Sequence, residues 1–248
     1  MRRLIILGVV LYALFIARQF PADVVAGWVL PDTVKVYGIR GSIWNGSADA
    51  VDPGAADIVL GDTQWTISPW WLLTARAKGT LSTDLSESSR VEAGFSKPFF
   101  GSKLHLTDIQ GILKLDALPV AMRPNQVNGN VGLSFESLTL DKMWPAAAQG
   151  SVDLVNLKVA RPRAIDLGSF EIVFDGQSSD PLTGTVSDTR SGLNIDGTLA
   201  LATDQSYLFE GNALATPEAD SAVAEALQFL GPINTDGTVA LSFSGTVE

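Results

Sequence analysis

The sequence predicts a mainly β protein: a bent antiparallel sheet with one flanking helix, preceded by a single N-terminal transmembrane helix. Three observations predict this fold class. Residues 4–17 are apolar without interruption, short runs after Pro31 alternate apolar and polar residues, and one late segment has apolar residues at helical spacing. Alternation with period two is typical of a strand that buries one face. The chain has 248 residues, enough to bury a sizeable core.

The apolar run 4–17 follows Arg2 and Arg3 and precedes Arg18. Its 14 residues are fewer than the roughly 20 that span a bilayer and fit the core of a signal peptide, but no A-x-A cleavage signature follows. We therefore expect an uncleaved signal anchor, with a cleaved signal as the alternative. Because basic residues stay on the cytoplasmic side, residues 1–3 would form a cytoplasmic tip while the rest crosses.

The clearest strand pattern lies at 237–247. Four apolar residues fall on one face of this strand: Val239, Leu241, Phe243 and Val247. Small residues occupy its other face, which is the pattern of a half-buried strand. In two other runs the alternation slips, between 135 and 138 and between 154 and 157, and a β-bulge would explain each slip.

Glycines recur with a common context after Pro31. Eight of them precede a small polar residue and then an apolar one: Gly41, Gly79, Gly129, Gly150, Gly184, Gly197, Gly237 and Gly245. We interpret each as a turn that starts a strand, because glycine supplies turn conformations. Their irregular spacing excludes a solenoid repeat. The pattern predicts a chain of hairpins, which favours an antiparallel meander.

One helix is predicted over 217–230. Thr216 can cap its start, and Gly231 followed by Pro232 would end it. We expect this helix to cover one face or one end of the sheet. Two shorter helical pieces are expected at 69–75 and 115–122.

Charge and cysteine content exclude several classes of function. The net charge is −10, and Arg2, Arg3 and Arg18 are the only charges among the first 18 residues. The remainder carries 17 − 3 = 14 Lys and Arg against 27 Asp and Glu, a net charge of −13. Such a body repels phosphate backbones, so nucleic acid is excluded as a partner. The absence of cysteine excludes disulfides, thiolate catalysis and cysteine-ligated metals.

The sequence contains no recognisable catalytic constellation. His105 is the single histidine, and we expect it on the surface of a strand. No G-x-S-x-G elbow, phosphate-binding loop or dinucleotide glycine pattern occurs. We therefore expect no enzyme activity, no cofactor and no metal site.

The tryptophans gather early in the chain. Five of the six lie within the first 71 residues: Trp28, Trp44, Trp65, Trp70 and Trp71. Core packing is the default interpretation, and a membrane-facing or groove-lining role is the alternative. Trp44 stands among glycines in GIRGSIWNGSAD, residues 38–49. We expect it to be a structural plug, with Gly41 and Gly46 letting backbone pass close to its ring; the alternative is an exposed binding residue.

Two segments carry a family resemblance. VYGIRGSIWNGSADAV is followed about 20 residues later by TQWTISPWWLLTARAKGTLS. In this order and spacing they resemble type II secretion system protein N. The residues that match the family pattern are Gly38, Gly41, Trp44, Gly46, Trp65, Pro69 and Leu72. Later segments, including the ending LQFLGPINTDGTVALSFSGTVE, extend the likeness over nearly the whole chain.

The resemblance implies a non-catalytic accessory component of the type II secretion machinery in the bacterial inner membrane. It implies one membrane span and contacts with other secretion-system proteins through the periplasmic part. The expected domains are a cytoplasmic tip at 1–3, a transmembrane signal anchor at 4–20, a juxtamembrane linker at 21–32 and a periplasmic β domain at 33–248.

A more distant likeness to AsmA-like proteins implies an alternative function. Their curved sheets enclose an apolar groove and are linked to lipid handling, so the chain would be a lipid-binding or lipid-transfer module. The candidate groove-lining residues are Val239, Leu241 and Phe243. Alternation alone fits both an open groove and a closed, sandwich-like core.

Overall fold

The computed structural model describes most of the chain after residue 18. The described residues are 8, 19–29, 34–52, 60–86, 89–115, 127–159, 165–177, 179–190, 192–217, 219 and 221–246. The predicted anchor at 4–20 lies outside them except for residues 8, 19 and 20, and so does most of the predicted helical piece at 115–122. No helix in the described ranges is long and apolar enough to cross a membrane.

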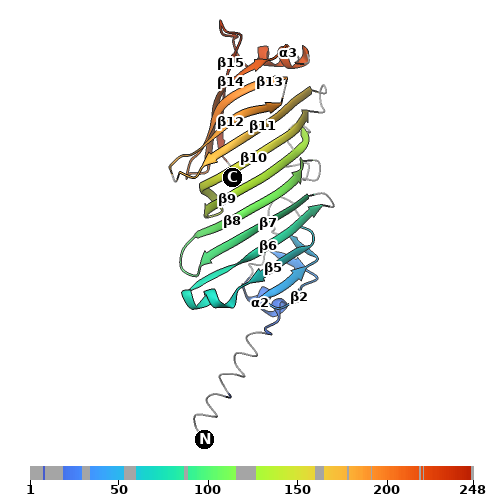
Figure 1. Ribbon diagram of the computed structural model, residues 1–248, viewed down its shortest axis with the longest axis vertical. Helices are drawn as coiled ribbons and strands as arrows, with labels where there is room; N and C mark the ends of the chain where they lie inside the picture. The colour runs from blue at the N-terminus through green and yellow to red at the C-terminus, as the bar shows by residue number, and fades with distance from the viewer. Residues whose placement is uncertain are drawn as a thin grey trace.

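Thirteen strands form one antiparallel sheet, stacked from β2 at one end of the molecule to β15 at the other (Figure 1). From the N-terminal edge the strands are β2 (Arg40–Gly41), β3 (Asn45–Ala48), β5 (Thr63–Ile67), β6 (Arg76–Ser86), β7 (Ser89–Pro98), β8 (Lys103–Lys114), β9 (Val127–Asp141), β10 (Trp144–Val159), β11 (Ile165–Asp175), β12 (Leu182–Arg190), β13 (Leu193–Leu201), β14 (Ser206–Ala215) and β15 (Val239–Thr246). From β5 to β15 each strand pairs with the next in the chain, which confirms the predicted meander.

The remaining elements lie mainly near the two ends of the sheet. They are a separate two-stranded sheet of β1 (Lys35–Tyr37) and β4 (Ala50–Asp52), the helices α2 (Ala22–Val29) and α3 (Ser221–Leu230), and the 3-10 helix η1 (Pro69–Thr74). Helix α3 ends before Gly231, as predicted, but it begins at Ser221 rather than at 217. Thr216 does not cap it, because the helix begins five residues later. The backbone N–H and the hydroxyl of Thr216 instead donate to the carbonyl of Gly192, at 2.8 and 3.0 Å.

Strand pairing gives the sheet one apolar and one polar face. Pairs such as Leu154 with Phe170 and Leu199 with Phe209 align apolar side chains across neighbouring strands. The ring centroids of Phe135 and Phe174 are 6.1 Å apart. The buried centre of this face comprises Ile109, Phe135, Ala148, Phe174 and Leu182. These residues come from β8 to β12, so the core lies along the middle of the sheet.

Helix α3 closes the apolar face at the C-terminal end. Its Val223 and Leu227 are buried against a second cluster, made of Leu157, Phe170, Leu193, Ala213, Val239 and Leu241. This agrees with the expectation that the helix covers one end of the sheet. The only other sheet in the described part of the chain has two strands, so no sheet of matching size faces the long one there.

Several strand glycines lie beside aromatic rings on the apolar face. A Cβ built on Gly150 would come within 3.0 Å of the Phe135 ring, and one on Gly197 within 2.8 Å of the Phe209 ring. The other glycines with such a ring neighbour are Gly46 with Trp65, Gly79 with Phe95, Gly184 with Phe174, Gly211 with Phe209 and Gly245 with Tyr207. Each ring therefore occupies the space that a side chain on the glycine would need.

These positions correct the turn role predicted for the glycines. Gly79, Gly150, Gly184 and Gly197 lie inside β6, β10, β12 and β13 rather than before them. The prediction is right for Gly237, which has a φ of 84° immediately ahead of β15. Most of these glycines thus mark either a turn or a place where an aromatic ring lies on the strand. Gly129, inside β9, lies beside the Leu157 side chain instead.

The two predicted bulges are confirmed by the pairing. The register of β10 against β11 shifts between Leu154 and Leu157. The register of β9 against β10 shifts where Ser137 and Phe135 face Gln149 and Gly150. Both shifts keep the apolar residues on one face despite the slip in the sequence pattern.

Gly184→Val tests whether a ring needs the space above a glycine. A Cβ at position 184 would lie 2.8 Å from Cε1 of Phe174 and 3.0 Å from Cγ2 of Ile172. We expect the substitution to lower the free energy of unfolding by about 1–3 kcal/mol through overpacking. Thr185→Val, on the exposed polar face next to it, should change it by less than about 0.5 kcal/mol. Chemical denaturation of the detergent-solubilised full chain measures both, and equal effects would contradict this role.

Candidate functional site

The residues of the family pattern build the N-terminal end of the sheet. Gly38 and Gly41 have φ values of 66° and 86°, which favour glycine. Gly38 lies against the Asp49 side chain, and Gly41 lies against the backbone of Asn45 across the β2–β3 hairpin. Both glycines therefore serve close approaches that a side chain would block.

Gly46 makes room for the ring of Trp65. The two residues face one another across β3 and β5, and a Cβ on Gly46 would lie 2.5 Å from Cζ2 of Trp65. Trp44 is half-buried in the bend before β3, and its carbonyl accepts a hydrogen bond from the Ile67 N–H at 2.7 Å. The plug role of Trp44 stays a prediction.

Pro69 and Leu72 belong to η1, the 3-10 helix that joins β5 to β6. This confirms a short helical piece in the region predicted at 69–75. Trp70 and Trp71 of η1 are exposed, and the Lys78 ammonium lies 4.7 Å from the centroid of the Trp71 ring. The structure therefore places these two tryptophans outside the core, where the sequence analysis gave core packing as the default.

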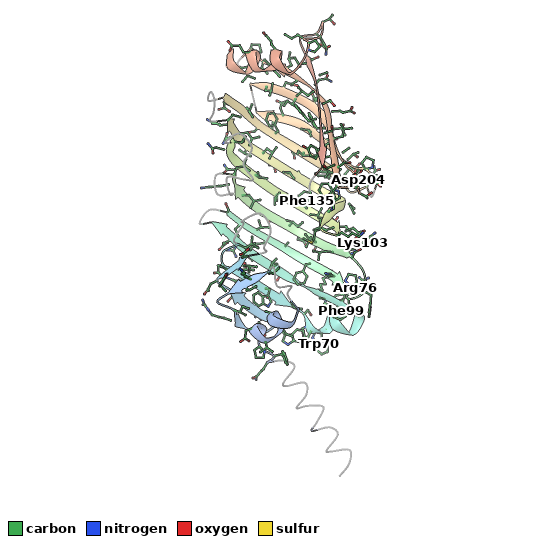
Figure 2. The ribbon with its side chains drawn as sticks, turned by 180° about the vertical axis from the view of Figure 1, so that it is seen from behind. Trp70, Arg76, Phe99, Lys103, Phe135 and Asp204 are labelled. Atoms are coloured by element: carbon green, nitrogen blue, oxygen red, sulfur yellow. The ribbon has the colours of Figure 1, made fainter. Side chains whose placement is uncertain are left out.

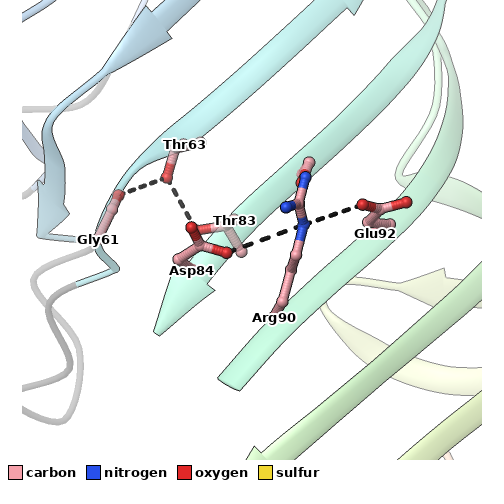
Figure 3. A network of polar contacts seen from close by, with 7 residues as sticks. Gly61, Thr63, Thr83, Asp84, Arg90 and Glu92 are labelled. Atoms are coloured by element: carbon pink, nitrogen blue, oxygen red, sulfur yellow. Dashed lines mark hydrogen bonds and ion pairs between the residues drawn. The ribbon is translucent and has the colours of Figure 1, made fainter. Parts of the chain in front are cut away.

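A polar network ties β5, β6 and β7 together (Figure 3). The buried hydroxyls of Thr63 and Thr83 are 2.8 Å apart, and Thr63 also donates to the Gly61 carbonyl at 3.0 Å. Arg90 lies 2.9 Å from a Glu92 carboxylate oxygen and 3.9 Å from one of Asp84. Because the charged members are exposed, each such pair contributes only about 0.2–1 kcal/mol.

A hollow of about 790 Å³ lies beside this network, lined chiefly by polar-face residues of β3, β5, β6 and β7. Its charged lining residues are Arg40, Asp49, Asp62, Glu92 and Asp108. Arg40 pairs with Asp49, so the remaining charge of the lining is negative. In the described ranges no group of three or more His, Cys, Asp or Glu residues is placed to hold a metal ion. An acidic hollow of this kind favours basic side chains of a partner.

His105 lies on the exposed surface of β8, as the sequence predicts. Its Nδ1 is 3.1 Å from the hydroxyl oxygen of Thr139 on the neighbouring strand. This contact gives the ring a cross-strand partner on a solvated face. It lies outside the lining of the acidic hollow.

The three candidate groove-lining residues have different surroundings. Val239 and Leu241 are 1% and 8% exposed and pack in the cluster with Val223 and Leu227 of α3. Phe243 is 47% exposed and stacks on Phe209, with 6.2 Å between ring centroids. A helix over part of the sheet was predicted from the sequence, but its packing against Val239 and Leu241 was not.

Sequence analysis also missed an open edge at β15. This strand pairs with β14 on one side, and on its other side the described residues supply only an isolated bridge from Ile233 to Val239. The edge from 241 to 246 is therefore open to another strand within the described part of the structure.

A second missed feature is a row of exposed apolar side chains, here called the aromatic rim. It consists of Trp70, Trp71, Phe99, Phe100 and Met143. These residues lie at one long edge of the sheet, where Trp70 and Phe99 are seen in Figure 2. Farther along that edge, hydrogen bonds from the Ser206 hydroxyl and backbone N–H hold the pKa of Asp204 below its usual value, so this carboxylate is charged.

Trp44→Ala tests whether Trp44 is a structural plug or an exposed binding residue. Because Trp44 is half-buried, we expect a loss of about 2 kcal/mol in the free energy of unfolding, less than for a fully buried tryptophan. Trp70→Ala is the matched control, since this exposed ring should matter little for stability. Thermal and urea unfolding of the full chain measure both free energies. An unchanged free energy of unfolding for Trp44→Ala would contradict the plug role of Trp44.

Comparison with known proteins places the chain in a family. The family model for type II secretion system (T2SS), protein N, matches residues 32–242. A type II secretion system protein N from Aeromonas hydrophila is 22% identical over 249 residues, covering 97% of this chain and 96% of that protein. No solved structure matches. The family match covers the hairpin with Gly41 and Gly46, the meander through β14 and the first half of β15, and the chain therefore belongs to the type II secretion system protein N family.

Proposed function

We propose that the protein is a non-catalytic accessory component of the type II secretion machinery, held in the inner membrane with its β domain in the periplasm. Membership of the protein N family supports a place in this machinery. The basic residues ahead of the apolar run 4–17 support the membrane attachment and its direction. The open edge of β15 is the observation that carries the proposed mode of action.

The β15 edge has the properties of a docking site for another strand. Its sequence, VALSFSGT, contains no charged residue and no proline. Natural edge strands are commonly protected by charges, proline or extreme shortness. The opposite edge follows that rule, because β2 is two residues long and includes Arg40. An extended segment of a partner would extend the sheet by pairing along 241–246.

The acidic hollow supports protein contact at the other end of the sheet. Two lining carboxylates, Asp62 and Asp108, form no ion pair with any described residue. Both are exposed and would attract a basic segment. The single histidine is engaged with Thr139 outside this hollow, so a general base of the usual type is not positioned in it. Recognition by contact, rather than by reaction, is the function that these surfaces favour.

Lipid binding is the second candidate, and one observation favours it. Phe243 and Leu81 are on the apolar face and remain 47% and 38% exposed. No sheet of matching size covers that face in the described part of the chain. An acyl chain would therefore find apolar side chains that the protein itself does not fully bury.

Photo-crosslinking in secreting cells tests the β15 edge. A p-benzoylphenylalanine at Ser244 lies on the exposed side of this edge strand, and we expect adducts with another secretion-system protein. The matched control is Thr185, exposed on the same face but in β12, whose two sides are paired. We expect no adduct there.

p-Benzoylphenylalanine at Phe243, which projects to the opposite face from its neighbour Ser244, distinguishes strand docking from lipid binding. A protein adduct at 244 with none at 243 or 185 would support strand docking. Adducts with phospholipid at 243, and none with protein at 244, would replace the contact proposal by lipid binding. Equal protein adducts at 244 and 185 would rule out the edge as the docking site.

A further inference from the structure

Hairpins bring the aromatic rim together from three separate segments. The backbone N–H of Phe99 donates to the Ala75 carbonyl at 3.0 Å, which joins the β7–β8 turn to the end of η1. Lys103 follows that turn and is the strand partner of Asp141 in the register of β8 against β9. The β9–β10 turn with Met143 comes directly after Asp141. The apolar side chains at 70–71, 99–100 and 143 therefore follow one another along the same edge.

The rim residues are among the most exposed apolar side chains of the described structure. Trp70, Met143 and Phe100 are 78%, 76% and 88% exposed. Scattered single apolar residues are normal on a surface, but a row containing two tryptophans and two phenylalanines indicates an interaction site.

The charge around the rim is opposite to that of the whole chain. Five cationic side chains accompany it, all exposed: Arg76, Lys78, Lys97, Lys103 and Lys142. Within the described residues, the ion pairs involve Arg40, Arg90 and Lys158, not these five. Asp141 is the one carboxylate in the segments 69–78, 97–103 and 141–144, and its Oδ1 is buried. The rim is thus a positive patch on a chain of net charge −10.

The same long edge becomes acidic toward the C-terminal end. Turns there carry Asp175, Asp180 and Asp204, all exposed. Figure 2 shows Trp70, Phe99, Arg76, Lys103 and then Asp204 in succession along this edge. An anionic surface would attract the first part of the edge and repel the last part, which fixes one orientation of the sheet.

We propose that the aromatic rim lies on the surface of an anionic phospholipid bilayer. Tryptophan favours the headgroup level because one end of its ring system is apolar and the other is polar. Phenylalanine inserts just below that level, while lysine and arginine bind anionic headgroups. The Lys78 ammonium beside the Trp71 ring combines both kinds of group in a single contact.

The inference rests on the proposed attachment to the inner membrane, since a bilayer must be within reach of the rim. It adds a second contact to the N-terminal anchor and a defined tilt. The sheet would stand with its N-terminal strands near the lipid and with α3 and the open β15 edge farther out. A partner in the periplasm could then reach β15.

A label at the rim tests this proposal in the full chain. Because the chain has no cysteine, Phe100→Cys provides one attachment point for an environment-sensitive fluorophore. Gln177→Cys, on the acidic part of the same edge, is the matched control. Both proteins are reconstituted in phosphatidylcholine–phosphatidylglycerol vesicles that contain spin-labelled lipids as quenchers. Flotation of the vesicles reports the N-terminal attachment separately from the label.

We expect lipid quenching at position 100 to be about twofold stronger than at 177. Adding Lys97→Glu and Lys103→Glu should reduce the quenching at 100 to the level at 177, because the anionic headgroups would then be repelled. Equal quenching at 100 and 177 in vesicles that float with the protein would overturn the proposal while leaving the anchor intact. A spectral shift at 100 that needs added secretion proteins would assign the rim to a protein partner instead.

Discussion

Over the described residues the apolar face of the long sheet has no second sheet of its own size to pack against. Its side chains must therefore cover one another, and the cross-strand glycines make this possible. Gly150 lies beside Phe135 and Gly184 beside Phe174, so each ring packs against the backbone of the neighbouring strand. The two rings then meet at 6.1 Å, a contact of the kind that contributes about 0.5–1.5 kcal/mol beyond burial. The same arrangement recurs from Trp65 near one end to Phe209 near the other.

Because the apolar side chains pack against one another on one face of the sheet, the other face, the last strand and the turns can contact other molecules. No sheet of matching size covers the polar face within the described ranges, and the acidic hollow is part of that face. Among the described residues the meander ends in an edge strand, β15, which pairs with β14 and otherwise makes only the isolated bridge to Ile233. The turns along one long edge carry the aromatic rim, while α3 covers the last strands at the opposite end from β2. The hollow, the β15 edge and the aromatic rim thus lie at separate places along one extended sheet.

Much of the fold could be predicted from the sequence because it depends on local patterns. Alternation predicts the strands, its two slips predict the bulges, and Gly231 predicts where α3 ends. The role of the strand glycines could not be predicted, because the ring that covers Gly197 lies on a neighbouring strand and its register is not visible in one sequence. The aromatic rim was missed for the same reason, since three distant segments form it. The family pattern includes Gly46 and Trp65, but their contact could not be predicted from it, because the pairing of β3 with β5 brings the ring next to the glycine.

A distance across the sheet tests this account most directly. Thr66 in β5 and Glu210 in β14 are exposed on the polar face, and nine strand-to-strand steps separate the two strands. At about 4.8 Å per step, spin labels on Thr66→Cys and Glu210→Cys should lie about 40 Å apart by electron–electron double resonance. One main distance in that range is the result expected for a single open sheet. A main distance below about 30 Å would mean that the two halves pack as a sandwich with their apolar faces about 10 Å apart, and would contradict it.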